Sequence, residues 1–348
     1  MKRSSAIDYL KFLFSIIIFL YHYGLIFEGG YIVVEGFFMI SGYLMFRSLQ
    51  KENARDELPD MTARFVFNKY KTLFLPLLFS AISGLLIYDL LVYPIPLSET
   101  LRDVPLLTFE VFPLQCAGFK ARYTTGVSWY ISAMLIATAI LHPFMRKSPK
   151  KVAYTVCPTL SILIYGFLRA TFGHLGVTSV WALDLFNSGL LRAIAGLSAG
   201  FLLGALLQRV EGWEPPMRYK LLLSALEFLG LVGLILAMSD ETLAYGPYDL
   251  VLMVLQFGIL WIALSGKAWH TRYISGKYTK FLSDASLYLF LNHVAWCAYF
   301  DQNYPSVEEK IQALPWAILF VASSCLIVWT LTSLTFLLKK KSKQKKTL

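Results

Sequence analysis

Charged residues are scarce in this sequence. Asp, Glu, Lys and Arg make up only 16% of its 348 residues, whereas 57% of the residues are hydrophobic. A soluble domain usually carries about 25% charged residues, so this chain has too little polar surface to cover an apolar core in water. The composition therefore argues against a soluble, disordered or nucleic-acid-binding protein, despite a net charge of +10. It favours an integral membrane protein whose apolar exterior is covered by lipid.

Cysteine is also scarce. The chain has 4 cysteines, at positions 116, 157, 297 and 325, and it contains neither a CxxC pair nor a cluster of Cys with His. A disulfide framework and a zinc site each need such spacing. The sequence therefore predicts no metal site and no bound cofactor.

Long apolar stretches recur along the chain. A helix needs about 20 mostly apolar residues to cross the hydrocarbon core of a bilayer, and ten segments meet or approach this length. They predict an all-α fold, namely a polytopic transmembrane helical bundle of about ten helices. The expected helices span residues 6–27, 30–46, 72–93, 128–145, 152–169, 187–207, 221–238, 250–265, 281–300 and 314–338.

Basic residues are distributed unevenly between the two sides of this bundle. They gather in the loops after even-numbered helices, while the other side has only Arg102, Lys120, Arg122 and Lys310, with Arg169 at a helix end. Cytoplasmic loops of membrane proteins are enriched in Lys and Arg, so both termini are expected in the cytoplasm. The basic groups are Arg47/Lys51/Arg55/Arg64/Lys69/Lys71, Arg146/Lys147/Lys150/Lys151, Arg209/Arg218/Lys220, Lys267/Arg272/Lys277/Lys280 and the tail lysines 339, 340, 341, 343, 345 and 346.

The same pattern predicts a single integral-membrane domain over residues 1–348, with a short basic tail at 339–348 and no soluble second domain. Asp8 and Lys11 interrupt the first apolar run, and no small-x-small cleavage site follows it. We therefore expect a membrane helix there rather than a signal peptide. The longest loop on the outer side, about 94–127, is expected to form a lid over an outward-facing site.

Ionisable side chains lie inside the first two expected helices, where a charge is costly and therefore a candidate for function. Lys11 and His22 are eleven residues apart, which places them on one face of a helix and about 16 Å apart in depth. Glu35 follows the Gly29–Gly30 turn at about the distance at which His22 precedes it. An antiparallel hairpin would bring Glu35 to the depth of His22. A carboxylate beside an imidazole fixes its tautomer and strengthens it as a base.

Structural alternatives for these residues stay open. A lone membrane histidine such as His22 often serves in a helix–helix hydrogen bond. Lys11 could extend to the cytoplasmic surface, and Glu35 could be a structural partner for Arg192.

Other small and polar residues have structural interpretations. Glycines recur every four residues in the expected sixth helix and predict close packing against a neighbouring helix. They are Gly196, Gly200 and Gly204. Three histidines lie at cytoplasmic helix ends or in loops and are expected on the surface, namely His142, His174 and His270.

The first two expected helices resemble those of a known family. The segment IDYLKFLFSIIIFLYH resembles the first helix of the acyltransferase-3 family, in which a basic residue, usually Arg, is followed after ten residues by His. Here these positions are Lys11 and His22, and Lys lacks the bidentate fork of Arg. The segment GGYIVVEGFFMISGYLM resembles the family's second helix, with Glu35 and Ser41 at matching positions.

Later segments carry weaker matches to the same family. The segment VSWYISAMLIATAILHP is similar to its fourth-helix segment, led by Trp129. The segment NKYKTLFLP, with Lys69 and Lys71, loosely matches the family's basic segment before the third-helix proline. Arg192 and His293 also have counterparts, so the resemblance covers most of the chain.

This resemblance implies a membrane O-acyltransferase of the bacterial cytoplasmic (inner) membrane. It would move an acyl group, usually acetyl, from cytoplasmic acyl-CoA to a hydroxyl of an envelope polysaccharide or lipid-linked sugar. His22 would be the catalytic general base or a transient acyl carrier, and the catalytic Glu35 would orient it. Binding of acyl-CoA is assigned to Lys11, Ser41, Lys69 and Lys71, and binding of the acceptor to Trp129, Arg192 and His293.

Two other functions fit the same composition. A transporter or flippase for a lipid-linked glycan or small solute would also use intramembrane Lys, His, Glu and Arg, but it would ideally show an internal repeat, and none is visible. A structural membrane subunit would tolerate replacement of His22.

Overall fold

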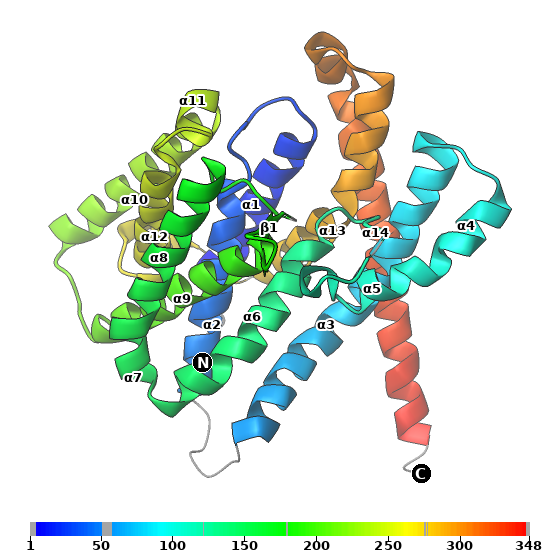
Figure 1. Ribbon diagram of the computed structural model, residues 1–348. Helices are drawn as coiled ribbons and strands as arrows, with labels where there is room; N and C mark the ends of the chain where they lie inside the picture. The colour runs from blue at the N-terminus through cyan, green and yellow to red at the C-terminus, as the bar shows by residue number, and fades with distance from the viewer. Residues whose placement is uncertain are drawn as a thin grey trace.

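The computed structural model describes residues 5–50, 58–120, 122–178, 180–274, 276 and 278–345 (Figure 1). Within these ranges each of the ten expected segments coincides with a helix of 16 residues or more. These helices are α1 (Ser5–His22), α2 (Ile32–Leu49), α3 (Leu58–Ile87), α6 (Ser128–Lys147), α8 (Cys157–Phe172), α9 (Ser188–Arg209), α10 (Met217–Met238), α12 (Asp249–Ser265), α13 (Thr279–Asn303) and α14 (Val307–Lys345).

Short elements connect the long helices. A two-stranded antiparallel hairpin pairs Trp181 with Asn187, and its turn residues Leu183 and Asp184 both have positive φ, as a tight hairpin requires. The short elements are α4 (Leu97–Asp103), α5 (Thr108–Val111), α7 (Pro149–Lys151), α11 (Glu241–Ala244), β1 (Trp181–Ala182), β2 (Phe186–Asn187), 3-10 turns at Val104–Leu107, Gln115–Ala117 and Trp269–Tyr273, and π-helical turns at Tyr88–Val92 and Val152–Val156.

The boundaries of two long helices differ from the expected ones. The helix α1 ends at His22 rather than near residue 27, because Gly24 and Phe27 both have φ of 68° in the left-handed region. The helix α3 begins at Leu58 rather than at 72. Its polar first turns continue the apolar part without a break.

Length and composition support the predicted all-α membrane bundle. Among the described residues, eight helices are long and apolar enough to cross a bilayer. The helix α12 has 17 residues and is too short for this criterion. The helix α13 is less apolar because it carries Lys280, Asp284 and Asp301.

Contacts between distant helices show in which direction each one runs. The Ser15 hydroxyl lies 2.8 Å from that of Ser286 near the start of α13. Tyr23, just beyond α1, packs on Phe300 near the end of α13. The first and ninth long helices are therefore parallel, as alternate crossings of one membrane require.

The helix α9 packs on α2 through the predicted glycine seam. A Cβ atom added at Gly200 would lie 1.9 Å from the backbone oxygen of Met39, so no larger residue fits without movement of the backbone. This close approach confirms the packing role of the seam. It also places Glu35 of α2 against Arg192 of α9.

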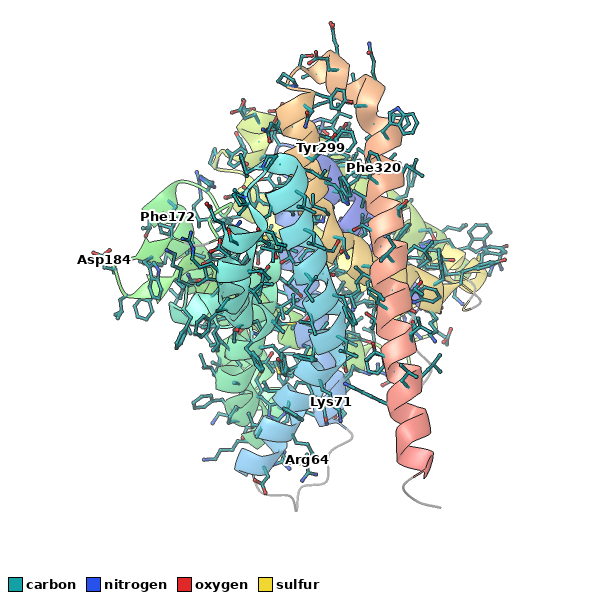
Figure 2. The ribbon with its side chains drawn as sticks, turned by 90° about the vertical axis from the view of Figure 1, so that its right-hand side faces the viewer. Arg64, Lys71, Phe172, Asp184, Tyr299 and Phe320 are labelled. Carbon is teal, nitrogen blue, oxygen red and sulfur yellow. The ribbon has the colours of Figure 1, made fainter. Side chains whose placement is uncertain are left out.

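Loops gather at two ends of the bundle. At one end, which we call the His22 end, the Gly29 amide donates to the backbone oxygen of Met238 over 2.8 Å. At the other, which we call the basic end, Lys267 pairs with Glu214 over 3.1 Å. Figure 2 shows Arg64 and Lys71 toward the basic end and Tyr299 toward the His22 end. The placement of the basic end and of both termini in the cytoplasm stays a prediction. Some of the predicted basic residues lie outside the described residues, namely Lys51, Arg55, Lys277 and the tail side chains from position 340.

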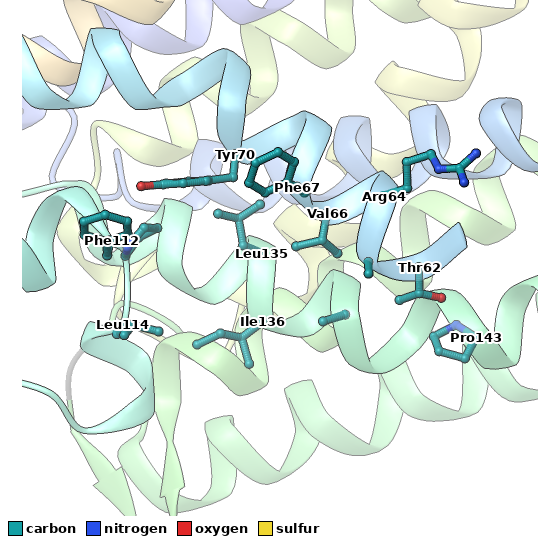
Figure 3. A pocket seen from close by; sticks show the side chains of 13 residues that line it. Thr62, Arg64, Val66, Phe67, Tyr70, Phe112, Leu114, Leu135, Ile136 and Pro143 are labelled. Atoms are coloured by element: carbon teal, nitrogen blue, oxygen red, sulfur yellow. The ribbon is translucent and has the colours of Figure 1, made fainter. Parts of the chain in front are cut away.

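A large apolar groove lies on the flank of the bundle between α3 and α6. Its volume is about 1070 Å³, and its lining includes Phe67, Tyr70, Phe112 and Leu135 (Figure 3). None of the candidate catalytic residues lines it. We therefore place the chemistry elsewhere.

Candidate functional site

Two histidines from distant parts of the chain meet at the His22 end. His22 is the exposed last residue of α1, and His293 is fully buried within α13. Their ring centroids are 5.2 Å apart, with the ring planes inclined by 44°. The structure thus brings the expected catalytic histidine together with a residue expected to bind the acceptor.

The hydrogen bonding of His293 defines what its ring offers to His22. Its Nδ1 lies 2.9 Å from the carbonyl oxygen of Leu289, and a carbonyl oxygen only accepts, so Nδ1 carries a proton. In the neutral imidazole Nε2 is then an acceptor. This atom is buried and has no hydrogen-bond partner among the described residues. His293 therefore carries a free acceptor lone pair on the ring that packs against His22.

Glu35 belongs to a separate buried cluster. The Arg192 Nε donates to Glu35 Oε1 over 2.6 Å, and both side chains are fully buried. The Tyr165 hydroxyl donates to the second oxygen, Oε2. The expected pair of Glu35 with His22 is therefore replaced by its alternative, the pair with Arg192. Equal depth in a hairpin leaves the rotation of each helix undetermined, and the glycine seam turns Glu35 toward α9.

The remaining donors of Arg192 hold nearby backbone. Its Nη1 donates to the Val177 oxygen over 3.1 Å and its Nη2 to the Tyr31 oxygen over 3.3 Å. The guanidinium also lies 5.3 Å from the ring centroid of Trp129, which favours a cation–π contact. Arg192 thus joins α9 to the start of α2 and to the loop after α8. Acceptor binding by Arg192 and Trp129 stays a prediction.

Ser41 lies in the interior of the bundle. It is 8% exposed, and its hydroxyl lies 3.4 Å from that of Tyr130 and 3.5 Å from the Met134 sulfur. Both partners belong to α6. Its expected contact with acyl-CoA stays a prediction.

Two of the lysines assigned to acyl-CoA approach each other. Lys11 of α1 and Lys69 of α3 are both half-buried and lie within electrostatic range of one another. Lys71 is exposed nearby on the same helix (Figure 2). Like charges repel, so an anion that binds between Lys11 and Lys69 relieves an unfavourable interaction. Phosphate groups suit such a position.

The expectation of a surface position is wrong for His142. Its side chain is fully buried, stacked on Phe65 with ring centroids 4.8 Å apart, and its Nδ1 lies 2.9 Å from the Thr62 hydroxyl. The cause is the early start of α3, whose first turns cover this end of α6. His174 and His270 are partly exposed, and burial lowers the pKa of each.

Sequence reasoning missed a buried carboxylate in the outer loop. Glu110 is fully buried and accepts hydrogen bonds from the backbone and hydroxyl groups of Thr124 and Thr125, and from the Ser128 hydroxyl. These bonds anchor the loop to the start of α6. The run of hydroxyl residues before that helix was the only signal, since nothing local links it to Glu110.

Among the described residues, no group of three or more His, Cys, Asp or Glu side chains could hold a metal ion.

A known protein family covers nearly the whole chain. Residues 4–333 match the family model described as an acyltransferase domain (Acyl_transf_3). No curated protein and no solved structure matches. With a family match over nearly its full length, in a bundle of apolar helices, the chain belongs to the acyltransferase-3 family and is a membrane acyltransferase.

Proposed function

We propose that this acyltransferase moves an acetyl group from cytoplasmic acyl-CoA to a hydroxyl of an envelope polysaccharide or lipid-linked sugar, in the bacterial cytoplasmic membrane. The observation that carries the proposal is the contact between the ring of the exposed His22 and the ring of the buried His293, whose Nε2 is an unpaired acceptor. The same helix carries Lys11 at a depth about 16 Å away, beside Lys69. The CoA phosphates would bind at the lysines, and the thioester would reach toward His22.

The reaction needs a base, because a sugar hydroxyl is a poor nucleophile. His22 takes the hydroxyl proton while the oxygen attacks the thioester carbonyl. The C–S bond then breaks, and CoA leaves as a thiol with the proton from His22. His293 acts as a positioning residue, because its Nε2 can accept a hydrogen bond from the His22 imidazolium. In this proposal His293 orients His22, which is the role that the sequence analysis expected of Glu35.

Radiolabelled acetyl-CoA tests the transfer directly. Membranes that carry the protein are incubated with this donor and host envelope glycans, and label on the glycan is measured. We expect label above that in membranes without the protein. Absence of label with a panel of acyl-CoA donors and glycans, at verified expression, would contradict the proposal and favour a transporter.

A second prediction concerns the donor site. Lys69→Gln is expected to raise the KM for acetyl-CoA about tenfold, because a hydrogen bond to a charged group contributes about 1.5–3 kcal/mol. The KM for acetyl-pantetheine, which lacks the nucleotide phosphates, should stay unchanged. Lys150→Gln, at an exposed lysine of the α6–α8 connection, is the matched control. An equal rise in KM for both donors would show that Lys69 acts on the fold rather than on phosphate.

A further inference from the structure

A small polar cavity opens between the outer loop and the β-hairpin. Its volume is about 190 Å³. Sites for drug-sized ligands have volumes of about 300–1,000 Å³, so this cavity suits a single small ring. Its lining includes Gln115, Phe119, Lys120, Tyr123, Trp181 and Asn187.

Gln115 lines this cavity and carries a buried, unpaired acceptor. The Ser128 hydroxyl donates its proton to Glu110, so it accepts from the Gln115 Nε2 over 2.8 Å. This contact fixes the orientation of the amide. Gln115 is only 5% exposed, and its Oε1 has no hydrogen-bond partner among the described residues. A buried unpaired carbonyl costs about 1–3 kcal/mol, so a small shift of the Gln115 side chain that lets a ligand hydroxyl donate to Oε1 is favoured.

Three partly exposed aromatic rings line the same cavity. Phe119, Tyr123 and Trp181 are 47%, 41% and 42% exposed. The Trp181 ring lies over the backbone of Gly118, 3.5 Å from the position of a Cβ there. Flat apolar faces beside a few fixed polar groups are typical of small-ligand sites. A sugar ring matches both, because its C–H faces pack on aromatic rings while its hydroxyls donate to an amide oxygen.

The cavity is linked to the histidine pair by its own loop. A Cβ atom added at Gly126 would lie 2.5 Å from the side chain of Val294, the residue after His293. The Gly126 amide in turn donates to the Tyr123 oxygen over 3.1 Å. The loop that supplies Tyr123 to the cavity therefore also packs, through Gly126, on the turn of α13 that carries His293.

We propose that this cavity binds one sugar unit of the glycan acceptor, which places a hydroxyl of a neighbouring unit near His22. The identity of the occupant rests on the proposed transfer to a glycan. Lys120, which also lines the cavity, adds a cationic donor and disfavours amino sugars with a free ammonium group.

Binding is tested without acyl-CoA. The full chain, in lipid nanodiscs free of sugar detergents, is mixed with methyl glycosides of glucose, galactose and N-acetylglucosamine, and saturation-transfer NMR is recorded. We expect transfer to at least one glycoside, its loss in Trp181→Ala, and its retention in Trp181→Phe. Trp213→Ala, which removes a 41% exposed tryptophan from the α9–α10 loop, and His22→Ala should both keep the signal.

Two results would overturn this site. One is the absence of transfer to every glycoside with the native chain, and the other is an undiminished signal in Trp181→Ala. Gln115→Leu provides a second variant and should also lose the signal. Since no acyl donor is present, a failure of the transfer reaction would leave this result unaffected, and the two proposals fail separately.

Discussion

His22→Ala should lower kcat for acyl transfer by about 10²–10⁴-fold, which is the usual contribution of a positioned general base. The substitution removes the only exposed imidazole of the pair, while His293 stays buried behind it. The rate of label transfer from acetyl-CoA is measured at equal amounts of protein in the membrane. Because the comparison is made at equal amounts of membrane-inserted protein, this loss reports chemistry rather than expression.

A histidine at the other end of the bundle serves as control for this experiment. His270 is partly exposed and contacts Ser224 and Glu227. His270→Ala should retain transfer. If His22→Ala labels glycan as well as the native chain does, the protein is still an acyltransferase, but His22 is not its catalytic base.

Arg192→Ala should destabilise the fold by about 3–5 kcal/mol, because removal of one partner leaves a buried charge without compensation. The carboxylate of Glu35 would keep only the Tyr165 hydroxyl. Thermal unfolding in nanodiscs measures the effect as a lower Tm and a smaller folded fraction. The loop after α8 also loses its bond through Val177, so early local unfolding is expected there.

Two further variants separate this effect from the simple loss of an arginine. The double variant Glu35→Leu with Arg192→Met removes both charges and should recover most of the Tm, since replacement of a buried pair by apolar residues is often neutral. Arg209→Ala, at the exposed end of the same helix, should change the Tm little. A native-like Tm in Arg192→Ala would contradict the structural role of the pair.

Local sequence patterns predicted the helices and the two candidate site residues of α1, Lys11 and His22. Apolar runs of membrane length gave the ten helices in their observed order, and the helical period placed Lys11 and His22 on one face of α1. The glycines of α9 predicted close packing against another helix. In the structure this helix is α2.

Patterns along the chain were least informative where a partner lies far away in the sequence. Glu35 could pair with His22 or with Arg192 at equal depth, and only the rotation of α2 against the glycine seam selects Arg192. His142 seemed exposed because nothing local shows that α3 extends over it.

The sequence by itself determined that this protein is a helical membrane bundle with a basic side, and it identified His22 as the residue of greatest interest. Hydrophobic length and helical period are properties of one segment, so they can be read without neighbours. Only the tertiary structure decided that His293 meets His22, that Glu35 binds Arg192, and that Gln115 and Trp181 line one cavity. These pairings depend on how side chains from different helices and loops interlock, and no single segment carries that information.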